Sequence, residues 1–356
     1  MVDYIRKEVL EIAGYHLASH PEALKLNQNE VSADIPGEIK AQVLEKIVRV
    51  PWNRYPQSQP FSLRDKLSQK LNWPSEGILI ANGSNVLIQA ILMATAINSR
   101  VMAVDPTFGL YEIEGKALGN EMVCVRLGEN FSFPLEAFLK SMAENPPAIV
   151  FLANPNAPTG NLFPREAMVE VIKNAPCLVV VDEAYFQFAD YHLFEELQNY
   201  KNLILLRTFS KAFGLGAIRI GYALADPAVA KEISKVLLPY CVSVLNEAVA
   251  EALLDHPEIV DLRVTDIKIG RAWLYQTLAS LEGAKSYASQ TNFVLFQVED
   301  AVRVFEGLLA EGVLIRNVSN PRSLPNALRV TVGTTQENER FVKALEKVLK
   351  SLKAES

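Results

Sequence analysis

From about residue 78 onward, short apolar runs alternate with longer amphipathic stretches. The runs are rich in Val, Ile and Leu, as expected for strands that are covered on both faces. The stretches between them, such as residues 86–97 and 165–174, fit helices. This alternation predicts an α/β fold with a large, doubly wound, mostly parallel sheet. The predicted strands are residues 78–81, 101–104, 122–125, 148–152, 178–181 and 203–207.

One further strand breaks the parallel pattern. Residues 218–223 read as a strand, yet only about ten residues separate them from the preceding run. A parallel crossover needs a dozen or more residues. We therefore expect 218–223 to run antiparallel to most of the sheet.

A smaller α/β domain is predicted after the large one. The chain has 356 residues, which is more than one compact core usually holds. A helical stretch over residues 243–281, broken near His256 and Pro257, leads into short alternating segments. These read as strands at 292–297, 313–316 and 328–332 and helices at 301–311 and 337–352. We expect an N-terminal segment, 1–47, that joins the small domain or a partner subunit, a large domain, 48–256, and a small domain, 257–356.

Composition excludes several classes of protein. A net charge of −6 without a dominant basic patch argues against nucleic-acid binding. The most apolar stretch, 86–97, is too short to span a bilayer, and the N-terminus lacks a signal-peptide run. Three widely spaced cysteines form neither a disulfide framework nor a zinc pattern. His16 and His20 lack an acidic third ligand, so we expect no metal. The cysteine pattern and the absence of a signal-peptide run favour a cytoplasmic location.

Polar and ionisable residues follow five of the predicted strands. In open α/β sheets, ligands bind beyond the carboxyl ends of the strands, so these residues predict a site at one edge. Polar turns could account for any one of them. The segments are Asn82-Gly83-Ser84-Asn85, Asp105-Pro106-Thr107-Phe108, residues 154–160, Asp182-Glu183-Ala184-Tyr185 and Thr208-Phe209-Ser210-Lys211.

Three of these segments carry specific chemistry. Gly83-Ser84-Asn85 opens an apolar helix, whose free N–H groups suit a phosphate, although a plain N-cap fits equally. Asp182 follows four apolar residues and needs a cationic partner, either a protonated pyridine nitrogen or a structural arginine. Lys211 has small, apolar neighbours that favour loss of its proton, although a solvated lysine is the alternative. Arg219 could return to the same edge and bind a phosphate as a fork.

Taken in order, these motifs resemble the fold type I pyridoxal-phosphate aminotransferases. The resemblance rests on Asn-Pro-x-x-Pro-Thr-Gly at 154–160, Asp-Glu-Ala-Tyr at 182–185, Ser-Lys at 210–211 and Arg-x-Gly at 219–221. More narrowly, the chain is similar to the histidinol-phosphate aminotransferases, with further matches at 26–30, 53–56 and 328–334. The resemblance covers nearly the whole chain.

The resemblance implies pyridoxal 5'-phosphate as cofactor. Lys211 would hold it covalently and later shuttle a proton, while Asp182 would pair with the ring nitrogen. Tyr185 would hydrogen-bond the ring O3' and Phe108 would stack on the ring. Tyr55 would reach the phosphate from the other subunit, which implies a homodimer with shared sites. The remaining phosphate contacts would come from Gly83, Ser84, Asn85, Ser210 and Arg219.

The substrate side is also implied by the resemblance. Arg329 would clamp the α-carboxylate of the amino donor, and Arg316 and Tyr15 would grip the phosphate of the acceptor. Asn29, in the match at 26–30, is expected at the substrate. Surface ion pairs are the alternative for the two arginines.

One position departs from the family pattern. Ala157 stands where the family usually has an asparagine directly before Pro-Thr-Gly, and Asn156 precedes it. Either Asn156 reaches the ring through a shifted loop, or Tyr185 makes the O3' contact together with water.

The implied reaction is transamination between L-histidinol phosphate and 2-oxoglutarate in L-histidine biosynthesis, run reversibly through imidazole acetol phosphate and L-glutamate. An aromatic amino-acid aminotransferase and a pyridoxal-phosphate decarboxylase of a phosphorylated amino acid are alternatives. A catalytically silent binding protein is a further one, against which Lys211, Asp182 and Arg219 argue.

Overall fold

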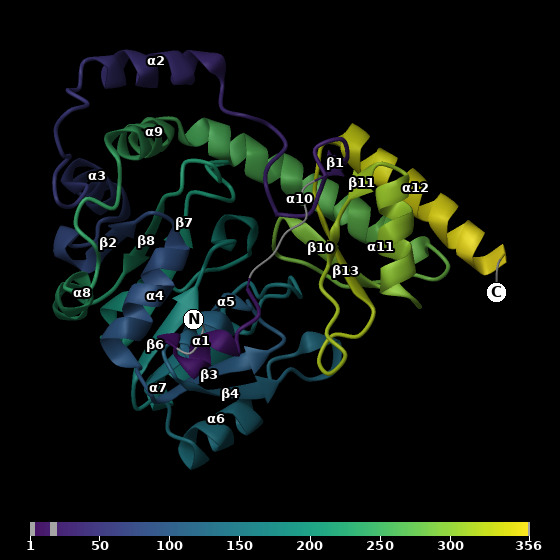
Figure 1. Cartoon of the computed structure of the whole chain (residues 1–356), viewed down its shortest axis with the longest axis horizontal. Helices are drawn as coiled ribbons and strands as arrows, with labels where there is room; N and C mark the ends of the chain where they lie inside the picture. The colour runs from purple at the N-terminus through teal and green to yellow at the C-terminus, as the bar shows by residue number, and fades with distance from the viewer. Residues whose placement is uncertain (1–3, 15–19, 355–356) are drawn as a thin grey trace.

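A large sheet lies at the centre of the computed structural model, which describes residues 4–14 and 20–354 (Figure 1). The strand order in this part of the chain is β2-β8-β7-β6-β5-β3-β4, and every neighbouring pair that does not involve β8 is parallel. This confirms the predicted mostly parallel sheet. The strands are β2 (Ile78–Ala81), β3 (Arg100–Asp105), β4 (Glu121–Arg126), β5 (Ile149–Ala153), β6 (Leu178–Asp182), β7 (Leu203–Thr208) and β8 (Gly221–Leu224).

The antiparallel strand is β8. It pairs antiparallel with β2 on one side and with β7 on the other. The prediction from the short connection is therefore confirmed, although the strand begins at Gly221 rather than at residue 218. Arg219, which has a left-handed φ of 58°, and the turn around it precede the strand.

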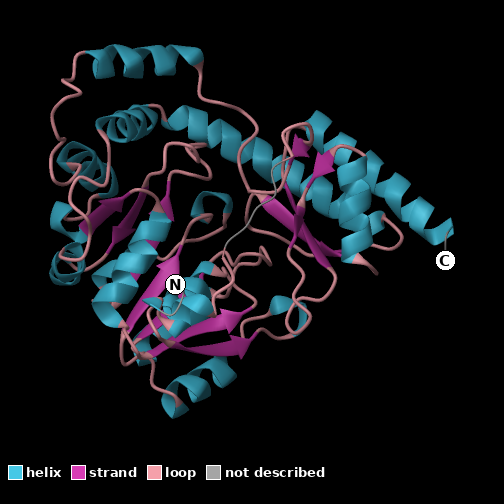
Figure 2. Cartoon of the chain, viewed as in Figure 1, coloured by secondary structure: helices cyan, strands magenta, loops and turns pink. Residues whose placement is uncertain are grey.

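Helices cover both faces of the large sheet (Figure 2). In β5, Val150 and Leu152 join one apolar cluster, whereas Ile149 and Phe151 join the cluster on the other face. Both faces therefore exclude water, which explains why the strands read as continuous apolar runs. One face is covered by α4 (Ser84–Thr95), α5 (Leu110–Ala117) and α8 (Pro227–Ser234), the other by α3 (Phe61–Leu71), α6 (Leu135–Glu144), α7 (Arg165–Asn174) and α9 (Val244–Asp255).

A second, smaller sheet lies in the C-terminal part of the chain. Its order is β12-β13-β10-β9, and its pairs are antiparallel. Three helices pack on it through one apolar cluster, which confirms the predicted smaller α/β unit. The elements are α10 (Pro257–Ser280), β9 (Lys285–Ser286), β10 (Phe293–Gln297), α11 (Ala301–Ala310), β12 (Arg316–Asn317), β13 (Ala327–Thr331) and α12 (Thr335–Ala354).

The structure differs from the sequence-based expectation in two strands. The predicted strand 313–316 is split at Ile315 into β11 (Val313–Leu314) and β12, because the two halves pair with different partners. Its first half pairs in parallel with β1 (Leu24–Lys25), a strand in a segment that showed no sheet pattern. Two residues are too few to give a periodic signal. The domain boundaries at residues 47 and 256 remain predictions.

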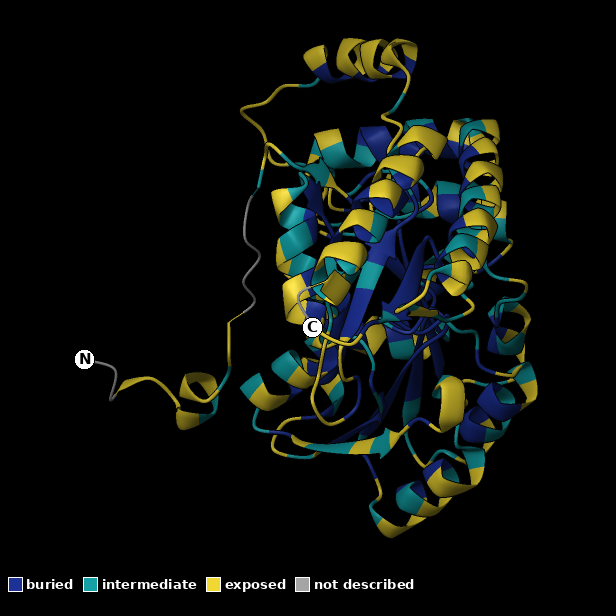
Figure 3. Cartoon of the chain, turned by 90° about the vertical axis from the view of Figure 1, so that its right-hand side faces the viewer, coloured by how far each residue is buried: buried dark blue, intermediate teal, exposed yellow. Residues whose placement is uncertain are grey.

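The N-terminal part lies at the periphery of the molecule. The short α1 (Lys7–Leu10) contacts α5, and α2 (Gly37–Val48) contacts α9. Figure 3 shows that α2 is largely exposed on its outward side. Its inner face buries Ile39, Val43 and Ile47, while Leu44 and Val48 are exposed. Within the described residues, no helix is long and apolar enough to span a membrane.

Candidate active site

The predicted cofactor residues Asp182 and Lys211 lie at the same edge of the large sheet. Asp182 is the last residue of β6, and β6 pairs in parallel with β7. Lys211 lies in the turn that follows Thr208, the last residue of β7. Parallel neighbours end at the same edge, so the two side chains come from adjacent strand ends.

Asp182 is a buried carboxylate that forms no ion pair with any side chain in the described part of the chain. It is 5% exposed, and Tyr111 Oη donates to its Oδ2 at 2.9 Å. The backbone N–H of Ala184 donates to its Oδ1 at 3.1 Å. Burial raises the pKa of Asp182 to about 6, although both hydrogen bonds oppose the shift. The two arginines that flank Asp182 in sequence bind other carboxylates, since Arg165 pairs with Glu196 and Arg207, on the neighbouring strand β7, pairs with Glu183.

Lys211 has a depressed pKa. Burial, followed by the positive charge of Arg329, lowers the pKa of its amine from 10.5 to about 8. Its Nζ donates to the backbone oxygen of Gln28 at 3.1 Å and lies 5.7 Å from the centre of the Tyr185 ring. The solvated-lysine alternative therefore does not describe this side chain. An amine with such a pKa is partly neutral near pH 7 and can act as a nucleophile or a base.

Tyr185 lies between the large sheet and the N-terminal segment. It is 7% exposed, and its ring packs edge-on against Phe293 with the ring centres 5.4 Å apart. The Asn29 side-chain amide donates to its hydroxyl oxygen at 2.7 Å. Burial raises the pKa of Tyr185, so its hydroxyl stays protonated and can donate a hydrogen bond.

The predicted phosphate residues come together where α4 begins. Gly83 precedes α4 with a left-handed φ of 86°, and no described side chain caps the helix. Arg219 Nη1 lies 3.3 Å from Ser210 Oγ, and a Cβ at Gly83 would lie 2.6 Å from Arg219 Nη2. A glycine, a hydroxyl and a guanidinium thus surround the open start of the helix that carries Ser84 and Asn85. This set of donors suits an anion.

Glycine is also required on the neighbouring strand. A Cβ at Gly221 would lie 2.3 Å from the backbone nitrogen of Ser84. No side chain fits that gap, so only glycine allows β8 to approach the start of α4. This close approach holds Arg219, two residues before Gly221, beside Gly83.

The two predicted substrate arginines lie opposite each other on the small sheet. Arg316 of β12 pairs with Arg329 of β13 in the antiparallel register. Directly opposite residues project from the same face, so both guanidinium groups lie on one side. Arg329 Nη2 donates to the backbone oxygen of Asn27 at 3.0 Å, and its guanidinium carbon lies 5.0 Å from the centre of the Phe293 ring.

A cavity of about 280 Å³ lies between the large sheet and the small sheet. Phe108 and Pro158 line it from the large sheet, and Arg316 lines it from the small one. Phe108 packs edge-on against Tyr111, with the ring centres 5.5 Å apart. The cavity thus places Arg316 opposite the residue predicted to stack on the ring.

The side chain of Asn156 is hydrogen-bonded to its own turn and to the loop that follows β3. Thr107 Oγ1 donates to its Oδ1 at 2.9 Å, and its amide donates to the Pro106 oxygen at 3.0 Å and to Thr159 Oγ1 at 2.7 Å. The residue is 0% exposed. These contacts favour the second possibility raised by Ala157, in which Tyr185 serves the ring oxygen.

Two predicted residues are not brought to this edge by the described part of the structure. Tyr55 is 85% exposed, and its ring lies 5.0 Å from that of Tyr240. Tyr15 lies outside the described residues, as does His16. A contribution of Tyr55 to a partner subunit remains a prediction.

Sequence reasoning missed Tyr111 and Arg263. Tyr111 is completely buried and donates to Asp182, but nothing in its local sequence distinguishes it from a core tyrosine. Arg263 is 7% exposed, and its guanidinium donates to the backbone oxygens of Phe213, Ala33 and Asp34. A buried position within the helical pattern of α10 was the only available signal for it.

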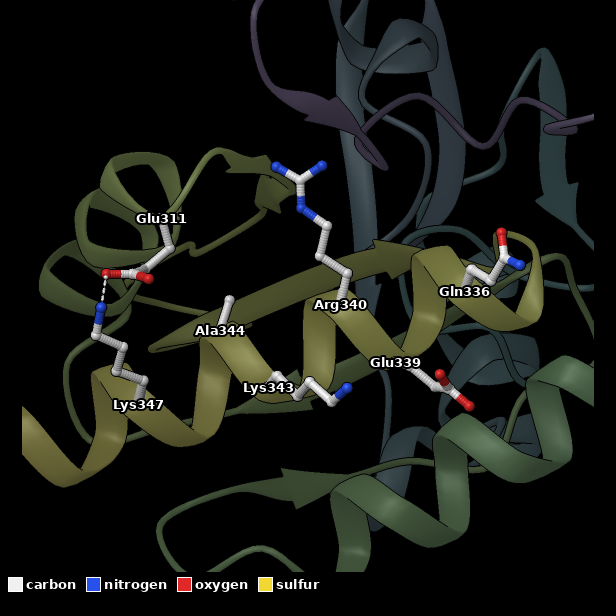
Figure 4. Close-up of a pocket in the computed structure, with 7 residues that line it drawn as sticks. All are labelled: Glu311, Gln336, Glu339, Arg340, Lys343, Ala344 and Lys347. Carbon is white, nitrogen blue, oxygen red and sulfur yellow. Dashed lines mark ion pairs between the residues drawn. The ribbon is translucent and has the colours of Figure 1, made fainter.

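A second hollow, of about 470 Å³, lies on α12 and has no link to these residues (Figure 4). Lys347 pairs with Glu311 across it at 2.8 Å. Its lining is charged and largely on one helix face, which is typical of a solvated surface. The lining residues are Glu311, Gln336, Glu339, Arg340, Lys343, Ala344 and Lys347.

Comparisons with known proteins identify the family of the chain. The family model described as aminotransferase class I and II matches residues 21–345. The chain is 39% identical to histidinol-phosphate aminotransferase 2 of Nitrosococcus oceani, over 97% of each chain. It is 35% identical to the histidinol-phosphate aminotransferase of Deinococcus radiodurans, over 96% of this chain and 95% of that one.

A solved structure shows the same fold. The histidinol-phosphate aminotransferase of Sinorhizobium meliloti in complex with pyridoxal-5'-phosphate superposes with a TM-score of 0.88, at 23% identity and over 98% of both chains. The fold, the family model and the two relatives lead to one assignment. The chain belongs to the class I and II aminotransferase family and, within it, to the histidinol-phosphate aminotransferases.

Proposed function

We propose that this chain catalyses pyridoxal-phosphate-dependent transamination between L-histidinol phosphate and 2-oxoglutarate, reversibly, in L-histidine biosynthesis. The observation that carries the proposal is the position of Asp182 and Lys211 at adjacent strand ends. Asp182 is a buried carboxylate that forms no ion pair among the described residues, and Lys211, whose charge acts on it, is an amine with a pKa of about 8. Both groups match one ligand, which is an aldehyde on a ring that carries a protonated nitrogen.

The residues at the sheet edge fit pyridoxal phosphate. When bound, the cofactor supplies an aldehyde that captures amino groups and a ring that withdraws electrons from the substrate α-carbon. Asp182 would face the ring nitrogen and hold a proton there. Arg219, Ser210 and the free N–H groups at the start of α4 would hold the phosphate. Tyr185 would donate to the ring oxygen, because its hydroxyl stays protonated.

Lys211 would move the proton of the reaction. With a pKa of about 8, roughly a tenth of its amine is neutral at pH 7. The neutral Nζ can accept a proton from the α-carbon of the amino donor. The protonated Nζ can later donate a proton to the corresponding carbon of the acceptor as the acceptor gains its amino group. Arg329 contributes to this lowered pKa through its charge, so the substrate-binding side of the site also tunes the base.

Two arginines on one face of the small sheet suit both substrates. Glutamate carries two carboxylates, and histidinol phosphate carries a phosphate without a carboxylate. Arg329 would bind the α-carboxylate of glutamate, and Arg316 would bind either the second carboxylate or the phosphate. Both are small anionic molecules, consistent with the cavity that Arg316 lines.

We further propose a homodimer in the cytoplasm. Exposed aromatic and aliphatic side chains gather near Tyr55, which is predicted to complete the partner's site; they include Trp52, Leu238 and Tyr240. The described cysteines are unpaired, which suits a reducing compartment. Sedimentation would give the mass of the assembly, and mixing inactive Lys211→Ala with Tyr55→Ala subunits should restore activity if sites are shared.

The first experiment tests the cofactor and its lysine. Wild-type protein loaded with pyridoxal phosphate should show a visible absorbance band that borohydride removes. Lys211→Ala should show no such reducible band and no steady turnover. The exposed lysine Lys201 lies near the start of β7, so Lys201→Ala is the matched control and should behave as wild type. Steady turnover by Lys211→Ala would refute the mechanism.

The second experiment tests the substrate. Histidinol phosphate and phenylalanine are compared as donors, with carbon dioxide release measured in parallel. We expect the phosphorylated donor to be preferred and Arg316→Ala to remove most of that preference, whereas Arg100→Ala, at the opposite end of the large sheet, should not. Preference for phenylalanine would indicate an aromatic aminotransferase, and carbon dioxide release a decarboxylase.

A further inference from the structure

Residues 24–34 form a strap that crosses from the small sheet to the active-site edge of the large one. At one end, Leu26 N–H donates to the oxygen of Leu314 in β11 at 2.8 Å, and the N–H of Thr331, in β13 of the small sheet, donates to the Leu26 oxygen at 2.9 Å. At the large sheet, the strap contacts Lys211 through the Gln28 oxygen and Tyr185 through Asn29. The strap therefore connects the two catalytic side chains to the small sheet.

Asn29 is the most constrained residue of the strap. It is 1% exposed and has a left-handed φ of 57°. Its N–H donates to Thr331 Oγ1 at 3.0 Å, and its backbone oxygen accepts from the Asn292 amide at 2.8 Å. Both of its backbone groups are thus hydrogen-bonded, and its side chain is directed toward Tyr185.

The orientation of the Asn29 amide is set by Thr331. Thr331 Oγ1 lies 3.4 Å from Asn29 Oδ1, so the amide oxygen faces the threonine and the amide nitrogen faces Tyr185. The Tyr185 hydroxyl oxygen is thus an acceptor in this contact. Its own hydrogen must then point elsewhere and is available to a ligand.

Few other polar groups can serve the same ring oxygen. Ala157 has no side-chain donor, and the Asn156 amide is engaged with Pro106 and Thr159. The charged groups that face Tyr185 are Arg329 from β13, Asp182 from β6 and Lys211 after β7. All three already have a role in the proposed site. The donation from Tyr185 therefore depends on what holds its hydroxyl.

We propose that Asn29 is a positioning residue that fixes Tyr185 as the hydrogen-bond donor to the cofactor ring oxygen. This inference rests on the proposed function, because it assumes that pyridoxal phosphate binds at Lys211. A donor at the ring oxygen stabilises negative charge there. Loss of the donor therefore makes the bound cofactor harder to deprotonate. The midpoint, which is the pH at which the visible band is half changed, then rises.

The test is a pH titration of the visible band of the loaded protein. Asn29→Gly removes the amide but keeps the left-handed backbone, which glycine adopts without strain. We expect the midpoint to rise by about one pH unit. Asn29→Asp replaces the donor by an acceptor that attracts the Tyr185 hydrogen, and it should raise the midpoint further. Asn72→Gly, at an exposed left-handed asparagine after α3, is the matched control and should leave the midpoint unchanged.

A double-mutant cycle separates positioning from other roles. Tyr185→Phe should raise the midpoint at least as far as Asn29→Gly, and adding Asn29→Gly to it should raise it no further, because the effect passes through the hydroxyl. An unchanged midpoint in Asn29→Gly would leave Asn29 with a purely structural role and overturn the inference. A full additional rise in the Tyr185→Phe background would do the same, because Asn29 would then act on the ring directly. A wild-type protein that takes up no cofactor would overturn the proposed function together with this inference.

Discussion

Two neighbouring carboxylates, Asp182 and Glu183, are both buried but have different surroundings. Glu183 is 1% exposed and pairs with Arg207, with Oε2 2.9 Å from Nε and 2.8 Å from Nη2. Its other oxygen accepts from the Leu193 N–H at 2.7 Å. Among the described residues, Asp182 accepts hydrogen bonds from a tyrosine hydroxyl and from one backbone N–H. A charge that the protein itself neutralises supports the fold, whereas a charge left without a cation marks the place of a ligand.

The comparison predicts opposite phenotypes at the two positions, and the largest effect is expected at Asp182. Asp182→Asn should lower kcat/KM by about 1000-fold, because the ring nitrogen loses the charge that holds its proton. The fold should persist, since an amide is easier to bury than a carboxylate. Steady-state kinetics and urea unfolding measure the two effects. Asp261→Asn, on the exposed side of α10, is the control, and near-normal turnover in Asp182→Asn would refute the assigned role.

Glu183→Gln should show the reverse pattern. It leaves the Arg207 guanidinium buried without a counter-charge, so the free energy of unfolding should fall by about 4 kcal/mol. Urea titration measures this loss. The double variant Glu183→Gln with Arg207→Met should regain most of the stability, because no buried charge remains. If Glu183→Gln were as stable as the wild type, the ion pair between Glu183 and Arg207 would not stabilise the fold.

Asp182 should contribute to the pH dependence of stability between about pH 4 and pH 6. Its pKa is raised from 3.8 to about 6, so folding favours the neutral acid. The associated stability is present below about pH 4 and is lost as the pH rises through 6, by about 3 kcal/mol in the cofactor-free protein. The free energy of unfolding is measured against pH for both proteins. Subtracting the values of Asp182→Asn from those of the wild type isolates this contribution. Bound pyridoxal phosphate should abolish the difference, because its ring nitrogen supplies the missing cation; a pH-independent difference in the cofactor-free protein would contradict the prediction.

The smallest effect is expected at Tyr111. Tyr111→Phe removes one hydrogen bond to Asp182, so the pKa of Asp182 should rise further. The loss of about 1 kcal/mol corresponds to about a fivefold weaker affinity for pyridoxal phosphate. Fluorescence titration measures the dissociation constant. Tyr191→Phe, which removes a hydroxyl bonded to Asn154 and Phe163, offers a matched control away from Asp182. Equal effects of the two variants would remove the link to Asp182.

Local sequence predicted the large sheet and the edge of the site, because strands buried on both faces are continuous apolar runs. Asp182 directly follows such a run and Lys211 comes four residues after the next one, and the resemblance to a known family gave both residues their expected roles. The antiparallel direction of β8 was predicted from the short connection between it and the preceding strand. These features depend on neighbours in sequence, which is why one chain sufficed to predict them.

Contacts between distant segments were not predictable in the same way. Tyr111 contacts Asp182 across 71 positions, and Asn29 contacts Tyr185 across 156. Neither residue follows a strand of the large sheet or breaks a pattern. The division of 313–316 into β11 and β12 was missed for the same reason, since it depends on β1, which lies near the other end of the chain. Such roles depend on how the chain is brought together, which no local window contains.

The reversed direction of β8 has a mechanical consequence. Because β8 runs back from the edge where β7 ends, the chain between Thr208 and Gly221 stays at one end of the sheet. Lys211 and Arg219 therefore both lie in the short connection between two strands that are hydrogen-bonded to each other. Any hinge movement of the small sheet would change the reach of Arg316 and Arg329 but leave the cofactor's attachment points at a constant spacing.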